Sequence, residues 1–302
     1  MKYAKLLFVL VAAVGCGSTV DTSKSLLDAR KGHQTQLSER QRSGVAPDQP
    51  PSGVFQLTTY PAQQGELSCY ITPDPGDGKK HPAIIWITGG ECNTIGDVWS
   101  PQPSSNDQSA AAFRQAGIVM MFPSLRGGNQ NPGHIEGFYG EVNDVLAAAA
   151  QLAHAPYVDP QRIYLGGHST GGTLVMLCAA ASDKFRAVFS FGPAHDVSAY
   201  GGQYTPIHIY NRTEVDLRSP IKWLHSIQSP IFVFEGTTEG NLVALQEMQG
   251  VNKNPLAQFF PIEGHDHFSV LDPINRVIAS KILADTGEKT NITFTAAELT
   301  GR

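Results

Sequence analysis

Short apolar runs alternate with longer helix-forming stretches along most of this chain. Continuous apolar runs bounded by turn residues are typical of buried strands, and one-sided apolar spacing is typical of helices. The expected strands cover residues 53–60, 66–72, 83–87, 117–122, 162–165, 187–191, 231–234 and 258–262, and the expected helices cover residues 107–115, 142–153, 170–181, 241–249 and 270–284. Alternation of this kind builds parallel βαβ units. The pattern predicts one α/β domain over residues 53–302, with a mostly parallel, doubly wound sheet and short antiparallel strands at its N-terminal side.

The first residues follow a different pattern. Lys2 and Lys5 precede an unbroken apolar run, which closes on Ala13-Val14-Gly15-Cys16. A basic start with about ten apolar residues is typical of a secretory signal, whereas a membrane-spanning helix needs about 20. We predict that residues 1–15 are a removable signal. The closing residues resemble a bacterial lipoprotein signal, in which Cys16 is lipidated and holds the exported domain at a membrane. An ordinary cleaved signal is the alternative, since Ala13 stands where leucine is usual.

A polar segment connects this signal to the expected domain. Residues 16–52 are rich in Ser, Asp, Gln and Lys and end in a proline- and glycine-containing turn. They show no sustained apolar period, which is typical of a linker. We therefore predict that residues 16–52 form a tether.

Composition narrows the classes of partner. The chain has 22 basic and 27 acidic residues, a net charge of −5 and no basic run, which argues against nucleic acid. The chain is 41% hydrophobic, which is enough apolar surface to build a core, so general disorder is excluded. Four scattered cysteines form no CxxC motif and there is no HExxH motif, so no metal and no other cofactor is expected. We expect a small-molecule or peptide substrate and no obligate protein partner. Whether Cys69 and Cys92 form a disulfide stays open.

A nucleophile motif stands between an expected strand and an expected helix. Gly167-His168-Ser169-Thr170-Gly171 matches the G-x-S-x-G elbow pattern, in which the serine occupies a strained turn between small neighbours. Its hydroxyl then projects at a helix N-terminus, where negative charge is favoured. The alternative is a glycine-rich turn whose serine only caps the helix. The context of strand and helix favours Ser169 as a nucleophile.

Candidates for the acid and the base follow the serine in chain order. Glu239 lies on the loop after the strand at 231–234, with Glu235 as second choice and Asp216 as third. Beyond the next strand, His267 is the preferred base and His265 the alternative. Imidazole accepts a proton near neutral pH, and a carboxylate orients it. This order of serine, acid and histidine is that of a catalytic triad on a parallel sheet.

Two further features complete the expected site. Glycines at residues 89–90 follow the first core strand, so backbone amides of Gly90 and Glu91, with that of Thr170, are the expected oxyanion donors. A tight strand-to-helix turn is the alternative for this loop. Residues 193–229 form the longest stretch between core strands, and we expect its aromatic residues Tyr204 and Trp223 to bind substrate. Surface packing is their alternative.

These motifs together resemble the α/β-hydrolase superfamily and, within it, the catalytic domain of the prolyl oligopeptidase family. The resemblance covers about residues 65–285, and its motifs lie at residues 89–90, 124–129, 137–145, 159–172 and 266–268. It implies a single α/β-hydrolase domain in which Ser169 is the nucleophile, Glu239 the acid and His267 the base. The chain departs from the family where Glu replaces the usual Asp, where Thr88 stands in place of a tyrosine, and where no long propeller region precedes the fold.

The resemblance implies a serine hydrolase that cleaves a peptide, amide or ester bond through an acyl-enzyme. The departures weaken the case for peptide substrates more than the case for acyl transfer. A carboxylesterase or thioesterase is therefore one alternative. A catalytically silent lipoprotein that uses the fold for binding is another.

Overall fold

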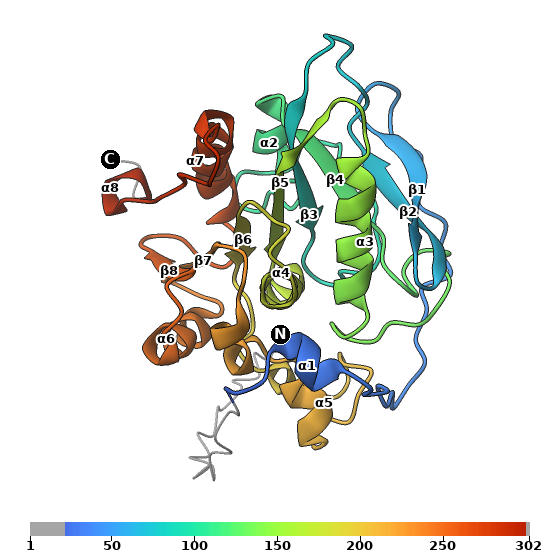
Figure 1. Cartoon of the computed structure of the whole chain (residues 1–302), viewed down its shortest axis with the longest axis vertical. Coiled ribbons are helices and arrows are strands. Elements are labelled where there is room, and N and C mark those ends of the chain that lie inside the picture. The colour runs from blue at the N-terminus through green and yellow to red at the C-terminus, as the bar shows by residue number, and fades with distance from the viewer. Residues whose placement is uncertain (1–21, 300–302) are drawn as a thin grey trace, which may run out of the picture.

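An eight-stranded sheet forms the centre of the protein (Figure 1). In this computed structural model, which describes residues 22–299, the strands are β1 (Gln56–Ala62), β2 (Gly65–Ile71), β3 (His81–Ile87), β4 (Val119–Pro123), β5 (Val158–His168), β6 (Val188–Phe191), β7 (Ile231–Gly236) and β8 (Ala257–Ile262). Their order is β1-β2-β4-β3-β5-β6-β7-β8. β2 pairs antiparallel with both β1 and β4, and all other pairs are parallel. This sheet confirms the predicted fold class. The predicted signal at residues 1–15 and Cys16 lie outside the described residues.

Helices cover both faces of the sheet. They are α1 (Leu26–Arg30), α2 (Ala111–Gln115), α3 (Glu141–Ala153), α4 (Thr170–Ala181), α5 (Arg212–Asp216), α6 (Leu242–Val251), α7 (Leu271–Ala284) and α8 (Ala296–Leu299), with short 3₁₀ turns η1 (Val197–Tyr200), η2 (Pro220–Lys222) and η3 (Leu224–Ser226). α3 and α4 lie together on one face, while α2 and α7 pack together on the other (Figure 1). Within residues 22–299, no helix is both long enough and apolar enough to cross a membrane.

The side chains of β3 show how one strand serves two cores. Ala83, Ile85 and Ile87 belong to the cluster that includes α3 and α4. Ile84 and Trp86 belong to the cluster that includes α2 and α7. Because side chains alternate between the faces of a strand, a continuous apolar run is what a strand buried on both faces requires.

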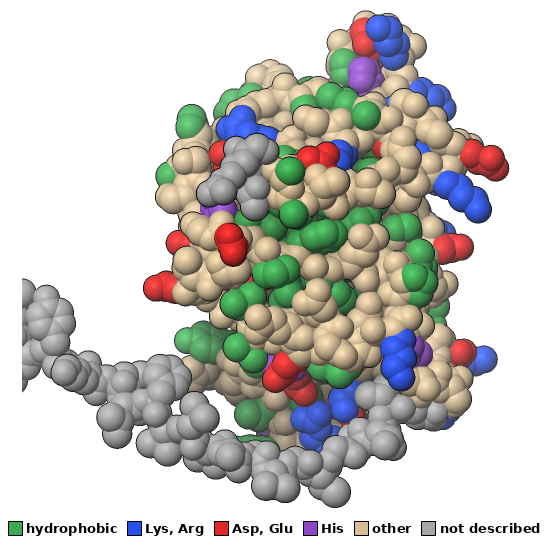
Figure 2. Space-filling model, turned by 90° about the vertical axis from the view of Figure 1, so that its left-hand side faces the viewer, with side chains coloured by type: hydrophobic (Ala, Val, Ile, Leu, Met, Phe, Trp, Pro, Cys, Tyr) green, Lys and Arg blue, Asp and Glu red, His purple; other side chains and the backbone are tan. Residues whose placement is uncertain are grey.

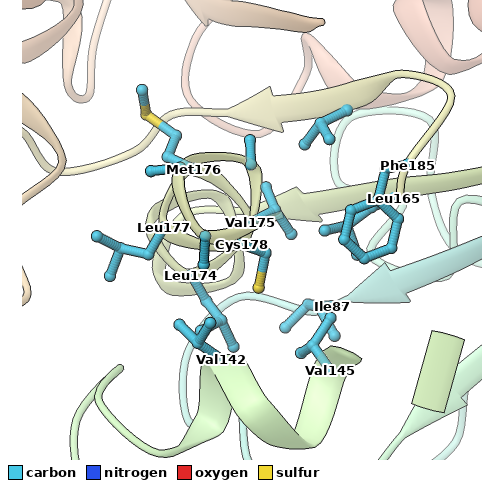
Figure 3. Packing of buried hydrophobic residues seen from close by; sticks show 14 of the residues in the cluster. Ile87, Val142, Val145, Leu165, Leu174, Val175, Met176, Leu177, Cys178 and Phe185 are labelled. Atoms are coloured by element: carbon cyan, nitrogen blue, oxygen red, sulfur yellow. The ribbon is translucent and has the colours of Figure 1, made fainter. Parts of the chain in front are cut away.

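Helix α4 is buried on nearly all sides. Every residue from 171 to 181 is buried, which explains why this helix has no polar face. Figure 3 shows α4 along its axis, between Val142 and Val145 of α3 and Leu165 of β5. The helix that follows Ser169 is therefore held firmly by its surroundings, and so is the turn that enters it.

Strand β8 forms one edge of the sheet, on the face shown in Figure 2. Hydrophobic side chains gather in a band across the middle of this face. An apolar pocket beside β8 is lined by Thr237, Leu242, Gln246, Phe260, Pro261, Ile262, Glu263, Ala296 and Leu299. None of these residues is a predicted catalytic residue.

The segment preceding the sheet packs against the domain, contrary to the tether predicted for residues 16–52. We call its described part, residues 22–52, the N-terminal strap. Leu26 is fully buried against the α3–α4 core. The Arg30 guanidinium donates hydrogen bonds to the carbonyl oxygens of Leu217 at 2.7 Å, Tyr139 at 2.9 Å and Phe138 at 3.0 Å. Burial and the nearby Arg218 cation lower the pKa of Arg30 to about 10.

A buried carboxylate fastens the next part of the strap to the segment between β6 and β7. Glu214 accepts hydrogen bonds from the His33 ring at 2.8 Å, the Thr35 hydroxyl at 2.9 Å and the Gln36 amide at 2.9 Å. Its other partner is Arg218, at 2.6 Å, and both side chains are about 1% exposed. The polar composition that suggested a tether therefore makes specific contacts, which a composition-based argument does not detect.

We expect Leu26→Ala to lower the free energy of unfolding by about 2–5 kcal/mol, because it removes a fully buried side chain. The matched control is Leu27→Ala, since the Leu27 side chain is 47% exposed and should matter by less than about 0.5 kcal/mol. Urea unfolding followed by circular dichroism measures both values. Equal, small effects would show that the strap is not part of the cooperative fold.

Candidate active site

Ser169 occupies a sharp turn between β5 and α4. Its backbone has φ 56° and ψ −114°, a conformation that costs a residue with a Cβ about 1–3 kcal/mol. The Ser169 amide donates a hydrogen bond to the Phe191 carbonyl at 2.7 Å, which ties the turn to β6. A Cβ atom at Gly167 would lie 2.7 Å from the Gly171 backbone, and one at Gly171 would overlap the Ile87 carbonyl. The predicted elbow is therefore present, and its glycines are sterically required.

A histidine and a carboxylate meet at the same edge of the sheet. His267 lies in the loop after β8, and its Nδ1 is 3.0 Å from Oε1 and 3.3 Å from Oε2 of Glu235. Glu235 is the penultimate residue of β7 and is fully buried. Its Oε1 also accepts the Asn241 amide at 2.7 Å. This pairing fixes one ring nitrogen of His267 and leaves the other available for chemistry.

The carboxylate beside His267 is Glu235, not the predicted Glu239. Glu239 is exposed on the turn beyond β7, and that turn folds back so that Gly240 lies against Glu235 and His267. The third choice, Asp216, ends α5 and pairs with Arg212. The alternative base His265 contributes its carbonyl to Thr238. Glu235 reaches His267 directly from the strand end, so a carboxylate farther along the loop is not needed.

Two glycines from different loops, Gly192 and Gly240, pack directly against the His267–Glu235 pair. A Cβ at Gly192, just after β6, would overlap the His267 ring and lie 2.6 Å from Glu235 Oε2. A Cβ at Gly240 would overlap Glu235 Oε1 and lie 2.7 Å from His267 Cβ. Both glycines have positive φ, of 56° and 111°. The pair is thus packed so closely that neither neighbour can carry a side chain.

Ser169 and His267 are brought near each other through adjacent residues. The ring of His168, next to Ser169, lies 4.5 Å from the His267 ring, measured between centroids. Gly192 follows Phe191, whose carbonyl binds the Ser169 amide, and packs on His267. Within residues 22–299, no hydrogen bond joins the Ser169 hydroxyl to His267; such bonds are commonly long in enzymes without substrate.

The loop after β3 lies beside the start of α4. The Thr170 hydroxyl donates to the Gly90 carbonyl at 2.8 Å, which brings two of the three predicted oxyanion residues together. Thr170 is the first residue of α4, where backbone amides have no partner within the helix. The Gly89 amide donates to Gln108 Oε1 at 3.2 Å. Gly90 and the exposed Glu91 therefore remain the candidates for donors from this loop, and their role stays a prediction.

A buried hydrogen-bond network around Arg126 supports the loop after β3 through Asn93. No function was predicted for these residues from the sequence. Asn93 donates from Nδ2 to the Arg126 carbonyl at 2.8 Å and to Glu141 Oε1 at 3.1 Å. The Arg126 guanidinium binds Asp144 through two hydrogen bonds, at 2.9 and 2.8 Å, and Glu136 at 2.8 Å. Burial alone would lower the pKa of Arg126, but these carboxylates outweigh it and raise that pKa. The network explains why the motifs at residues 124–129 and 137–145 occur together.

The two aromatic residues predicted to bind substrate differ in burial: Trp223 is buried and Tyr204 is exposed. Trp223 is only 7% exposed, belongs to the α3–α4 core, and donates its Nε1 hydrogen to the Asp216 carbonyl. Trp223 is therefore packed in the core, and its predicted role in substrate binding stays a prediction. Tyr204 is 75% exposed, and its binding role stays a prediction.

Tyr200, another aromatic residue of this segment, is connected to the elbow through Thr173. Its hydroxyl lies 2.7 Å from Thr173 Oγ1, and Thr173 donates to the Ser169 carbonyl at 3.2 Å. Thr173 also accepts the Ala194 amide at 2.9 Å. No spacing motif marks Tyr200, because its partner Thr173 lies on a different element.

Among residues 22–299, no group of three or more His, Cys, Asp or Glu side chains could hold a metal ion. Cys69, Cys92 and Cys178 are buried and free, so the question of a disulfide between Cys69 and Cys92 is answered in the negative for this structure. Burial raises the pKa of the Cys69 thiol to about 12, which keeps it protonated near neutral pH.

Comparison with known proteins adds a family and a set of relatives. A profile described as the prolyl oligopeptidase family matches residues 104–281. The chain is 26% identical over 237 residues to "Dipeptidyl-peptidase 5" of Porphyromonas gingivalis, covering 69% of this chain and 33% of that protein. It is 31% identical over 157 residues to "S-formylglutathione hydrolase" of Mus musculus, covering 42% of this chain and 53% of that protein. The chain thus spans only about a third to a half of these relatives.

Solved structures with the same fold include peptidases and an esterase. The dipeptidyl peptidase 4 of Porphyromonas gingivalis superposes with a TM-score of 0.60 at 18% identity, covering 76% of this chain and 35% of that chain. An esterase from Pyrobaculum calidifontis superposes with a TM-score of 0.57 at 17% identity, covering 78% of this chain and 86% of that chain. These identities show the fold alone, and they confirm the predicted α/β-hydrolase architecture. The names of the sequence relatives support the predicted class of hydrolase.

Proposed function

We propose, since this chain belongs to the prolyl oligopeptidase family, that it cleaves ester or amide bonds by acyl transfer, with Ser169 as nucleophile, His267 as base and Glu235 as the orienting acid. The observation that carries this proposal is the hydrogen bond of 3.0 Å between His267 and the buried Glu235, beside a strained serine turn. A strained residue with positive φ persists only where its surroundings enforce it. Serine, histidine and carboxylate at one edge of a parallel sheet are the arrangement of a triad.

In this mechanism His267 Nε2 takes the proton of the Ser169 hydroxyl as Oγ attacks the carbonyl carbon of the substrate. Glu235 accepts the Nδ1 hydrogen of His267 and stabilises the imidazolium that forms. The tetrahedral oxyanion is bound by backbone amides of Thr170 and of the loop at Gly90 and Glu91. His267 then donates its proton to the leaving group. In the second half, His267 takes a proton from water, which attacks the acyl carbon; the bond to Ser169 Oγ breaks, and Oγ receives the proton back from His267.

Two substrate classes follow from the relatives. The match to a dipeptidyl-peptidase covers the larger share of this chain and favours peptide or amide substrates. The match to S-formylglutathione hydrolase favours a thioester or ester. The match covers only 33% of the peptidase relative. We therefore propose acyl transfer as the reaction and treat the choice between peptide and ester substrates as a separate question.

The direct test is labelling with a fluorophosphonate, which reacts with activated serines. We expect one adduct, mapped by mass spectrometry to the peptide that contains Ser169. The second part of the experiment compares p-nitrophenyl acyl esters with proline-containing dipeptide anilides. Turnover of esters alone would reject the peptidase class. Absence of an adduct at Ser169 would reject the enzyme and favour a binding protein on the same fold.

A further inference from the structure

Two polar side chains outside the proposed triad, Gln108 and His168, connect the loop after β3 with the backbone of His267. Gln108 lies in the loop before α2, and its backbone carbonyl is held by the Trp86 indole at 3.1 Å. His168 precedes Ser169 and is fully buried. Gln108 Nε2 lies 2.9 Å from His168 Nδ1, and His168 Nε2 lies 2.9 Å from the His267 carbonyl oxygen. At the other end, the Gly89 amide donates to Gln108 Oε1 at 3.2 Å.

Gln108 Oε1 also lies 3.1 Å from His168 Nδ1, so the groups at the two ends of the series decide which atoms donate. The His267 carbonyl can only accept, so His168 Nε2 carries a hydrogen and donates it. The Gly89 amide can only donate, so Oε1 is the acceptor of Gln108 and Nε2 its donor. Neutral His168 then has an acceptor at Nδ1, which receives the Gln108 Nε2 hydrogen. Gln108 Nε2 places its second hydrogen on Asn106 Oδ1, at 2.8 Å.

We propose that Gln108 and His168 are positioning residues: together they form an uncharged bridge that sets the distance between the oxyanion loop at Gly89 and the backbone of the base, His267. This bridge rests on the proposed function, because it acts through the two groups that function requires. Since the Gly89 amide is occupied by Gln108, the loop is oriented so that the amides of the following residues, Gly90 and Glu91, are left for substrate.

The electrostatic surroundings keep the bridge uncharged. Burial, followed by the neighbouring His267, lowers the pKa of His168 to about 3. The groups that face His168 are the His267 ring, the Phe268 ring and Gln108, so no carboxylate stabilises a cation there. His168 therefore keeps one tautomer while His267 gains and loses its proton.

The test uses three variants that interrupt different links. Gln108→Met keeps the length of the side chain and removes both hydrogen bonds to Gly89 and His168. His168→Gln places an amide donor near the position of Nε2 and retains the link to His267. His168→Asn is shorter and can accept from Gln108 but cannot reach the His267 carbonyl.

We expect Gln108→Met and His168→Asn to lower kcat by about 10- to 100-fold, the size of effect that misplacing a catalytic group by about 1 Å produces. KM should change by less than about threefold, because the bridge does not touch substrate. His168→Gln should recover most of the kcat lost in His168→Asn. Active-site titration with the fluorophosphonate gives kcat per reactive Ser169, so a partly unfolded sample does not imitate the effect.

The matched control is Asn252→Leu. Asn252 donates its amide hydrogens to the carbonyls of Asn254 and Ala257 at 3.0 Å each, at the opposite end of β8 from His267. It should lower thermal stability without changing kcat per titrated site. If the Gln108 and His168 variants behave like Asn252→Leu, or if His168→Asn is more active than His168→Gln, the bridge is wrong and the triad stands. If wild-type Ser169 is not labelled, the proposed function falls and the bridge with it.

Discussion

Replacing Ser169 with alanine is expected to lower kcat/KM by about 10⁶-fold, because a triad without its nucleophile keeps only the binding and oxyanion contributions. The fold should remain, since Cβ and the backbone conformation are unchanged. The measurement is the hydrolysis rate of the best ester or anilide from the substrate panel, with fluorophosphonate labelling of the same samples. A variant that retains more than about a hundredth of the wild-type rate would point to a different nucleophile.

A second substitution at the same position separates catalysis from strain. Ser169→Gly also removes the hydroxyl, but glycine adopts φ 56° without the steric cost that serine and alanine carry. We expect this variant to be as inactive as Ser169→Ala and about 1 kcal/mol more stable. Equal stability of the two variants would show that the turn is not strained, whatever its role in catalysis.

Glu235→Gln is expected to lower kcat by about 10⁴-fold with little change in KM, because an amide favours the wrong tautomer of the histidine and cannot stabilise the imidazolium. The substitution keeps the shape of a side chain that is fully buried. Stopped assays over a wide range of enzyme concentration would measure the residual rate after active-site titration.

The control for this variant is Glu239→Gln, on the loop four residues after Glu235. Glu239 is exposed and lies beyond the contact with His267, so the substitution should leave kcat within about twofold of the wild type. A large loss for Glu239→Gln together with an active Glu235→Gln would reverse the assignment made from the structure. A second comparison, His267→Ala with His265→Ala, tests the base in the same way.

Much of the fold follows from local patterns. The apolar runs at residues 83–87 and 231–234 lie within β3 and β7, because a strand covered on both faces needs apolar residues at every position. The elbow at Ser169 was predictable for a similar reason. The small neighbours that it requires stand next to it in sequence, where a motif can capture them.

The carboxylate that lies beside His267 was harder to predict because its position depends on a fold-back of the chain. Glu235 and Glu239 lie four residues apart after the same apolar run, and spacing favours the one on the loop. In the structure Glu235 lies beside His267, and the Asn241 amide and the turn at Gly240 enclose it. Such an enclosure joins Glu235 and the loop after it with a histidine that lies 32 positions after Glu235, which no local pattern reports.

The N-terminal strap shows the same limitation for a whole segment. Its polar side chains are those of a linker by composition, yet Arg30 and the groups around Glu214 are satisfied by carbonyls and carboxylates near residues 136–140 and 214–218. A polar segment remains a flexible linker only when its hydrogen-bonding groups find no fixed partners. Those partners are contributed by the loop before α3 and by the segment between β6 and β7, and they become visible only once the chain is folded.

The crowding of His267 and Glu235 by Gly192 and Gly240 has a consequence for how this protein can change. These two glycines supply no functional group, yet a single methyl group at either one would push His267 away from Glu235. Laboratory evolution aimed at new substrates therefore has little freedom on this side of the histidine. Useful variation is left to exposed positions away from these two glycines, such as Tyr204, whose side chain is 75% exposed.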